Sequence, residues 1–184
     1  MTSGAAAARY ARALFDVARQ EQADLEAIHR ELTDVVRVVT THETLMRALS
    51  NPAVSIVRKR AVVDALLARA PGMPPMLTKT IRMLADRDRL ALLPQIASAF
   101  DARLMDFRRV VRAEVITAME LPPDRLASLK DGLARATGRE VNLSTRVDPS
   151  ILGGAVARIG STVFDGSVTR QLEKLKDSLI AAAE

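Results

Sequence analysis

The chain has 184 residues, 48% of them hydrophobic, and carries a formal net charge of +5. This apolar content is enough for the core of one domain or of two small ones. The absence of cysteine excludes a disulfide framework and a thiolate metal site, and two histidines, His29 and His42, are too few to build a zinc site. No apolar run approaches the roughly 20 residues that a membrane-spanning helix needs, so we expect no direct membrane span.

Apolar residues recur at helical spacing from residue 5 to about residue 107. The breaks fall at Asn51-Pro52 and in the proline-rich run 71–75, where turn-forming residues gather. Ser55 is placed to cap the next helix, and Pro94 fits the first turn of the last one, where its missing N–H costs no hydrogen bond. We therefore predict a six-helix bundle, with apolar stripes at 7–17, 25–39, 45–49, 63–67, 77–84 and 93–107.

The hydrophobic period changes after Arg109. Residues 111–115 alternate in the manner of a partly buried strand. A proline pair, Pro122-Pro123, then opens a helix that Gly138 is expected to end as a C-cap. A second, smaller domain therefore begins near residue 108.

The last third of the chain alternates again over 141–147 and continues through Asp-Pro, a glycine pair and a second extended segment to Asp165-Gly166. We predict that the two extended segments form a hairpin that leads into a final helix. The predicted fold is mainly α with a smaller α+β part. It consists of a six-helix bundle over 1–107 and a strand-helix-strand-strand-helix domain over 108–184.

Three ordered blocks of the sequence are similar to one known family. They are RYARALF at 9–15, LADRDRL at 84–90 followed by Leu93-Pro94, and the run 146–175 with its RVDPSILGG, IG and DGS segments. Together they resemble the delta subunit of F-type ATP synthases, the bacterial counterpart of the oligomycin-sensitivity-conferring protein. The blocks lie in the family's order and span nearly the whole chain.

The resemblance implies a non-catalytic stator subunit. In that family the first and fifth helices form a groove for the amphipathic N-terminal helix of an alpha subunit of the alpha/beta catalytic head, and the C-terminal domain meets the C-terminal region of the b-subunit stalk. We therefore expect a peripheral protein on the cytoplasmic side of the cell inner membrane, without cofactor. Arg9, Arg12 and Asp16 interrupt the alanine-rich N-terminus before a signal-peptide core can form, which agrees with that location.

Carried over to this sequence, the resemblance places two sets of contact residues. The residues expected to bind the alpha-subunit helix are Ala7, Tyr10, Ala11, Leu14, Met76, Thr80 and Met83. Those expected to bind the b subunit are Leu152, Val156, Ile159, Phe164 and Leu172. Ordinary core packing remains an alternative for the first-helix stripe and for each residue of the second set.

The sequence gives only weak support for a phosphate-binding loop, a catalytic serine or a metal site. Gly153, Gly154, Gly160 and Gly166 lack phosphate-loop spacing, so we interpret them as shaping the chain. Ser161 and Ser167 have no histidine near them in sequence, and Ser167 is better explained as a helix cap. The run Asp86-Arg87-Asp88-Arg89 is interpreted as a charged connection between the fifth and sixth helices rather than a metal or acid pair. No catalytic or metal site is therefore predicted.

A basic cytosolic RNA-binding or ribosome-associated protein is the alternative function, because the sequence pI is about 10.2. The charge is spread thinly, however: 1–105 hold fifteen basic and eleven acidic residues, and 106–184 hold twelve and eleven. Aromatic residues, on which bases stack, make up only 3% of the chain. We interpret the densest clusters, 58–60 and Arg108-Arg109-Arg112, as solvated helix faces and expect no nucleic-acid partner.

Overall fold

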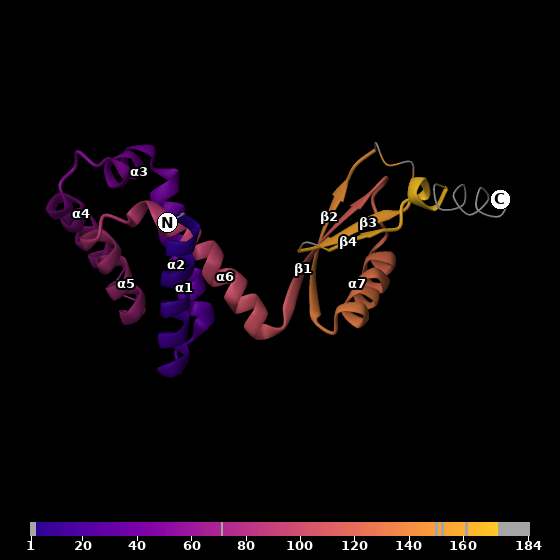
Figure 1. Cartoon of the computed structure of the whole chain (residues 1–184), viewed down its shortest axis with the longest axis horizontal. Helices are drawn as coiled ribbons and strands as arrows, with labels where there is room; N and C mark the ends of the chain where they lie inside the picture. Colours follow the sequence, from indigo (N-terminus) through magenta and orange to yellow (C-terminus); the bar gives the residue numbers. More distant parts are fainter. Residues whose placement is uncertain (1–2, 71, 150, 152, 161, 173–184) are drawn as a thin grey trace. The chain divides into compact units, whose positions relative to one another are not determined.

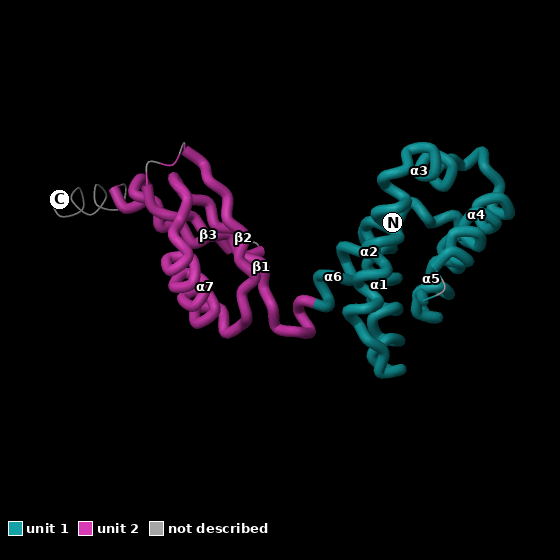
Figure 2. The backbone as a smooth tube through the Cα atoms, turned by 180° about the vertical axis from the view of Figure 1, so that it is seen from behind, with its two compact units in different colours: residues 1–104 teal, residues 105–184 magenta. Residues whose placement is uncertain are grey.

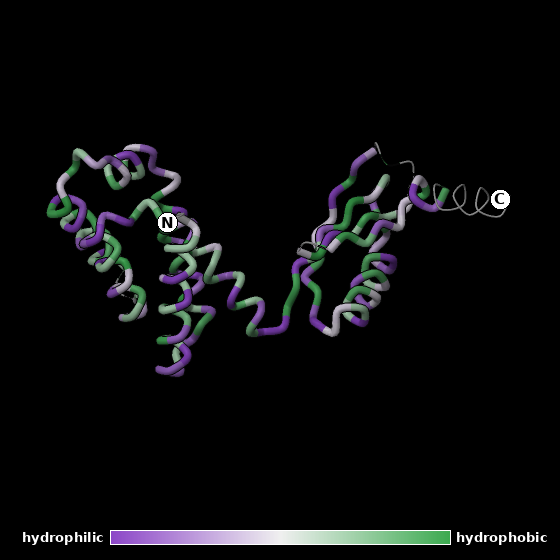
Figure 3. Tube along the Cα trace, in the orientation of Figure 1, coloured by the Kyte–Doolittle hydropathy of each residue, from purple (hydrophilic) through white to green (hydrophobic). Residues whose placement is uncertain are grey.

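The computed structural model describes residues 3–70, 72–149, 151, 153–160 and 162–172 (Figure 1). The chain divides into two compact units, residues 1–104 and 105–184 (Figure 2). We predicted the change of domain at residue 107, and the division falls three residues earlier. Apolar residues occur along both units (Figure 3), and each unit has a hydrophobic core of its own. The predicted class, mainly α with a smaller α+β part, is confirmed.

The first unit is helical. Its elements are α1 (Ser3–Gln20), α2 (Leu25–Thr41), α3 (Glu43–Ser50), α4 (Ile56–Ala68), α5 (Pro75–Asp86), a 3-10 turn η1 (Leu90–Leu92) and α6 (Leu93–Arg108), which runs into the second unit. Pro94 lies in the first turn of α6, as predicted. Ser55 is the N-cap residue of α4 and has the extended backbone of that position, as predicted, but its side chain makes no capping hydrogen bond.

The core of this unit is filled by apolar side chains from the helices and η1. Ile28, Leu77 and Phe100 are fully buried, and the Phe15 ring meets Phe100 edge-on with 5.6 Å between ring centroids. Burial of one side chain of this size stabilises the folded state by about 1.5–3 kcal/mol relative to leaving it in water. The helical spacing of these residues therefore gives each helix one apolar face, and packing of those faces stabilises the bundle.

The connection between α5 and η1 is held by ion pairs to α4. The Lys59 ammonium donates to the Asp88 carboxylate, and Lys59 is only 1% exposed. Arg60 donates to Asp86 at 2.9 Å. Our interpretation of 58–60 as a solvated helix face was therefore wrong for Lys59. Its burial is made possible by a counter-ion 29 residues away in the sequence, which no local pattern indicates.

The second unit is a four-stranded sheet with one helix against it. Strands β1 (Val110–Thr117), β2 (Glu140–Val147), β3 (Ala155–Ile159) and β4 (Thr162–Asp165) lie in the order β2-β1-β3-β4, and α7 (Pro123–Thr137) packs on one face (Figure 1). The predicted C-cap is confirmed, because Gly138 has a left-handed backbone with φ 65°.

The predicted hairpin between 141–147 and the next extended segment was wrong. β2 pairs in parallel with β1, whereas β3 pairs antiparallel with both β1 and β4. The hairpin thus lies within the second extended segment, which turns at Gly160 with φ 57°. The physical reason is that α7 forms a crossover between β1 and β2, which is the connection that parallel strands require.

The glycine pair of the C-terminal block allows two backbone segments to approach closely. Gly154 has φ 87°, and a Cβ atom there would lie 2.4 Å from the Gly166 carbonyl oxygen. The N–H groups of Gly166 and Val168 donate to the carbonyls of Ala155 and Gly153, both at 3.0 Å. These glycines therefore shape the chain, as predicted, and bring 153–155 against 166–168.

We expect Asp88→Asn to lower the free energy of unfolding by about 3 kcal/mol, because it leaves a buried ammonium without a counter-ion. Asparagine tolerates the left-handed backbone of residue 88, whose φ is 53°, so the change acts on charge alone. Lys59→Met should lower the free energy of unfolding by less than Asp88→Asn does. The Asp88 carboxylate that then lacks a partner is 38% exposed and stays hydrated. The double variant should recover most of the Asp88→Asn loss in urea unfolding. A double variant whose loss equals the sum of the single losses would contradict the pairing.

Gly154→Ala should destabilise the second unit by about 2 kcal/mol or more, because the new methyl group meets backbone at a strained φ. Gly132→Ala is the matched control. Gly132 lies inside α7 with nothing within 4 Å of the added Cβ, so this change should stabilise by roughly 0.5–1 kcal/mol. Amide hydrogen exchange in β1 and β3 measures both effects, and equal effects of the two changes would refute the close approach.

Candidate docking site

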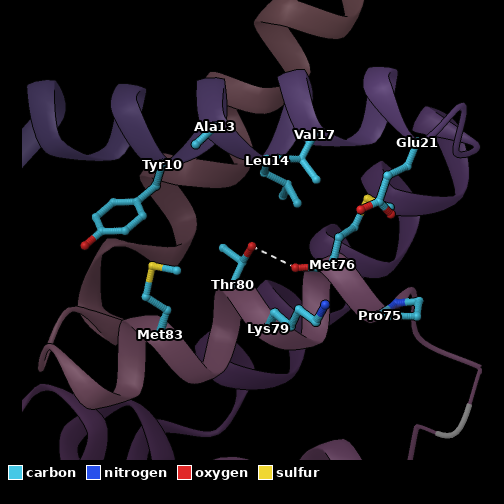
Figure 4. Close-up of a pocket in the computed structure, with 10 residues that line it drawn as sticks. All are labelled: Tyr10, Ala13, Leu14, Val17, Glu21, Pro75, Met76, Lys79, Thr80 and Met83. Carbon is cyan, nitrogen blue, oxygen red and sulfur yellow. Dashed lines mark hydrogen bonds between the residues drawn. The ribbon is translucent and has the colours of Figure 1, made fainter.

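A groove of about 230 Å³ lies between α1 and α5 in the first unit (Figure 4). One wall comes from successive turns of α1 and the other from α5, which packs beside it. The lining residues are Tyr10, Ala13, Leu14, Val17 and Glu21 from α1 and its end, and Pro75, Met76, Lys79, Thr80 and Met83 from α5. The groove is therefore a feature of two neighbouring helices, and no loop is needed to form it.

Helical spacing explains why these side chains share one surface. Tyr10, Leu14 and Val17 follow each other at steps of four and three residues, which places them along one face of α1. Leu14 is 3% exposed and forms the floor, whereas Val17 and Met83 are 41% and 45% exposed and form the rims. The groove thus leaves apolar side chains open to water between two helices, which is a surface suited to the apolar face of a third helix.

The hydroxyl group of Thr80 in the groove has a hydrogen-bond partner within its own helix. The Thr80 hydroxyl donates to the Met76 carbonyl at 2.8 Å, so it is already satisfied by its own helix (Figure 4). The two methionines, Met76 and Met83, have flexible and polarizable side chains that adapt to a partner's shape. The floor and rims of the groove therefore offer mainly apolar contact to a partner.

Two arginines lie at the Tyr10 end of the groove. Arg89 Nη1 donates to the Tyr10 hydroxyl oxygen at 3.1 Å, and its guanidinium carbon lies 5.9 Å from the centroid of the Tyr10 ring. Partial burial raises the pKa of Tyr10, but hydrogen bonds and positive charge from Arg89 and Arg87 outweigh it and hold the pKa below the usual value of 10. This end of the groove is thus electropositive.

The structure places five of the seven residues predicted for the first helix groove on its lining: Tyr10, Leu14, Met76, Thr80 and Met83. Ala7 and Ala11 lie elsewhere, at 1% and 0% exposure in the core, so they are corrected to packing residues. Their small side chains let other helices approach α1 closely. Ala13 and Lys79 lie within the two segments that the resemblance indicated, 7–14 and 76–83, without being named individually, whereas Glu21 and Pro75 were missed as lining residues. Sequence reasoning placed Val17 on the α1 stripe without assigning it to the groove.

The second predicted set is not brought together on one surface. Phe164 pairs opposite Ala157, and Ile159 lies two residues further along β3, so both face the α7 side of the sheet. Val156 lies on the opposite face, by the alternation of the strand. Leu172 is 56% exposed and belongs to the helical residues 168–172, and Leu152 lies outside the described residues.

A shallow hollow of about 440 Å³ occupies the α7 side of the sheet over β3 and β4. It is lined by Leu129 and Leu133 of α7 and by Phe164, which is 43% exposed. Val168 is 41% exposed beside this hollow, whereas Val163, 50% exposed, lies on the opposite face of β4, because it pairs with Arg158 while Phe164 pairs with Ala157. This part of the second unit therefore carries exposed apolar side chains near the edge strand β4, a second surface on which a partner can pack.

The remaining candidate groups have structural partners. Ser167 caps the helical residues 168–172, since its hydroxyl accepts from the Arg170 N–H at 3.2 Å, as predicted; Ser161 lies outside the described residues. His29 Nε2 lies 3.2 Å from Asp101 Oδ1 and joins α2 to α6. Within the described residues, no group of three or more acidic or histidine side chains is placed to hold a metal. The same residues include no helix long and apolar enough to cross a membrane.

Comparison with known proteins gives consistent matches over nearly the full length. Residues 6–179 match the family described as "ATP synthase delta (OSCP) subunit". The ATP synthase subunit delta of Myxococcus xanthus is 39% identical over 180 residues, covering 97% of this chain and 98% of that protein. That of Citrifermentans bemidjiense is 34% identical over 179 residues, covering 97% and 98%.

A solved structure also has the same fold. One chain of the Toxoplasma gondii mitochondrial ATP synthase hexamer aligns with a TM-score of 0.65 at 24% identity, covering 95% of this chain and 97% of that chain. The similarity of the two backbones at this low identity supports the arrangement of helices and sheet described above.

The single tyrosine of the chain makes the Arg89 contact measurable. We expect Tyr10 to ionise below pH 10 in an absorbance titration and Arg89→Met to move that pKa upward, because it removes a hydrogen bond to the phenolate. Because the pKa of Tyr10 is lower in the folded state than in the unfolded state, ionisation of Tyr10 stabilises the folded protein. The free energy of unfolding of the wild type should therefore rise relative to that of Arg89→Met as the pH rises through the folded-state pKa toward 10. This difference should disappear as the pH falls below that pKa. The same pKa in both proteins would contradict the contact.

Proposed function

The chain belongs to the ATP synthase delta (OSCP) subunit family. We therefore propose that it is the non-catalytic stator subunit that links the alpha/beta catalytic head to the b-subunit peripheral stalk. In this role it couples proton-driven rotation to ATP synthesis by resisting torque. The observation that supports the proposal most directly is the open apolar groove between α1 and α5.

The first unit, residues 1–104, is proposed to bind the head. Its groove accepts the apolar face of an amphipathic helix, the N-terminal helix of an alpha subunit. Tyr10, Leu14, Met76, Thr80 and Met83 are the proposed contacts, with Val17 added because it forms a 41% exposed rim. Residues three and four apart on the incoming helix would pack between the rims, as in other helix-in-groove complexes.

The second unit is proposed to bind the C-terminal region of the b subunit. Phe164 and Leu172 are exposed apolar residues and are kept as contacts, together with Ile159 beside the hollow. Val156 lies on the other face of the sheet. If it binds the b subunit, it would do so at a part of the interface separate from Phe164 and Ile159. The proposal for Leu152 concerns a position outside the described residues.

A two-ended link explains how a small protein can resist torque. A helix in a groove buries roughly 800 Å² per partner at most, and interfaces of that size span micromolar to picomolar affinity. Holding head and stalk together makes the second contact intramolecular, which raises avidity by roughly 10² or more. The protein is therefore proposed to act as a peripheral subunit on the cytoplasmic side of the inner membrane, with binding surfaces instead of an active site.

We predict that Val17→Asp weakens binding of an alpha-subunit N-terminal peptide by at least about tenfold in calorimetric titration of the full chain. The change puts a charge on the apolar rim, which must be desolvated when the peptide binds. Val38→Asp is the matched control, because Val38 is also an apolar residue 41% exposed, but it lies on α2 outside the groove. The Val38→Asp variant should bind the peptide with the same affinity as the wild type.

Circular dichroism and thermal unfolding show whether both variants fold. Equal weakening by the two changes would remove the groove from the proposal. A folded wild-type chain that fails to bind the peptide would contradict the head-binding role itself. A salt-sensitive nucleic-acid affinity in the same protein would then favour the RNA-binding alternative.

A further inference from the structure

Helix α4 is more apolar than a helix at the surface of a bundle needs to be. Nine of its 13 residues are apolar, and they occur on its outer side as well as its inner side. The helix lies at the edge of the first unit and packs mainly against α5 (Figure 2). A helix that is apolar all round is normally buried all round. The described part of the chain leaves the outer side of α4 uncovered.

The outer side of α4 is an apolar stripe open to water. Lys59 and Val63 face inward and are 1% and 3% exposed. Val57 lies on the opposite side of the helix, by its spacing from both, and is 77% exposed. The stripe and its border consist of Val57, Ala61, Val62, Ala65 and Ala68, all of them exposed. We call these five residues the α4 outer face.

The two flanks of the α4 outer face differ in charge. On the flank toward α5, Arg60 and Asp64 form ion pairs with each other and with charged residues of α5. On the other flank, Arg58 and Arg69 are exposed, and neither forms an ion pair with a carboxylate of the described residues. One flank is therefore compensated within the bundle, whereas the other carries two positive charges.

These two charges have a defined spacing. Arg58 and Arg69 lie three turns apart on the same side of α4, which is roughly 16 Å along its axis. A helix lying along the α4 outer face would pass both guanidiniums. Carboxylates on that helix would pair with them, and an uncharged or basic flank would leave them covered but uncompensated.

We propose that the α4 outer face binds an amphipathic helix of a protein partner whose apolar side carries carboxylates along one flank, against Arg58 and Arg69. The alanines of this face let the partner helix approach closely, since the distance between packed helices depends on the side chains at the contact. A second copy of this chain fits poorly, because it would bring the same two arginines to the contact. The carboxylates of the partner should lie about 11 residues apart, to match the two arginines.

This surface is distinct from the groove between α1 and α5, with which it shares no residue. The inference rests on the proposed function, because the partner helix is expected within the assembled ATP synthase in which the chain works. It adds a further contact of the first unit to the two ends already proposed.

Thiol accessibility in the assembled complex tests whether the face is covered. The chain has no cysteine, so Ala61→Cys places one thiol at the centre of the α4 outer face. Its reaction with a maleimide should be at least about tenfold slower in the assembled ATP synthase than in the free chain, because a buried thiol is out of reach. Ala102→Cys, at an exposed alanine of α6, is the matched control and should react at similar rates in both. Equal rates at residue 61 in the two states overturn the inference.

Charge reversal tests the chemistry of the partner. Arg58→Glu combined with Arg69→Glu should reduce the protection of residue 61 about tenfold at low salt, because like charges would then meet. The reduction should shrink at about 1 M salt, where the screening length is about 3 Å. Arg30→Glu, at an exposed arginine of α2, is the control and should leave the protection unchanged. Equal losses from both changes, or no loss from the pair, contradict an acidic flank.

A benzophenone attached to Ala61→Cys identifies the partner segment by mass spectrometry of the cross-linked peptide. The segment should have apolar residues at steps of three and four, with two carboxylates about 11 residues apart on one flank. A segment without this acidic flank overturns the inference. Protection of residue 61 that appears in the free chain as its concentration rises would assign the face to a second copy instead and also overturns it.

The outcomes separate this inference from the function on which it rests. A chain that enters the complex and binds the alpha-subunit peptide, but in which residue 61 stays reactive, contradicts only this inference. A chain that folds, as checked by circular dichroism, but does not enter the complex contradicts the proposed function and this inference together.

Discussion

The buried ion pair between Lys59 and Asp88 is the contact on which the organisation of the first unit depends. An ammonium that is 1% exposed is tolerated only with a counter-ion, because an isolated charge in an apolar core costs several kcal/mol. Asp88 meets that requirement from a left-handed backbone position, which fixes the course of the chain between α5 and η1. The same turn directs Arg89 to Tyr10 and so joins α4, the connection and α1.

The groove follows from how α1 is shared between two surfaces. Alanines at 7, 11 and 18 are fully buried and let other helices approach α1 closely. The adjacent face, with Tyr10 and Val17, is left open beside α5. One helix thus stabilises the bundle with its small residues and offers its larger ones to a partner. Because the backbone on which they stand is already helical and packed, docking of a helix would need no loop to be ordered.

Local spacing was sufficient to predict much of this structure. The steps of three and four residues in the first half identified six helices, and Gly138 marked the end of α7. The groove lining was found for Tyr10, Leu14, Met76, Thr80 and Met83, but only because a family resemblance indicated the helix pair. Periodicity alone identifies an apolar face without telling core from open surface, and this is why Ala7 and Ala11 were misplaced.

The errors share a physical cause, which is dependence on contacts distant in sequence. Burial of Lys59 requires Asp88, and the parallel pairing of β2 with β1 depends on the crossover through α7. The partition of the α5–η1 connection, with carboxylates toward α4 and guanidiniums toward Tyr10, likewise needs three elements in place. Such arrangements leave no periodic signal in the chain.

Site-specific photocross-linking in the assembled ATP synthase tests the central claim most directly. A benzophenone attached to Val17→Cys, in a chain that otherwise has no cysteine, would sit on the rim of the groove. We predict cross-links to the N-terminal segment of an alpha subunit, and none to it from the same label at Val38→Cys on α2. Cross-links from the groove to a different subunit, or equal yields of the alpha-subunit product from both positions, would contradict the account.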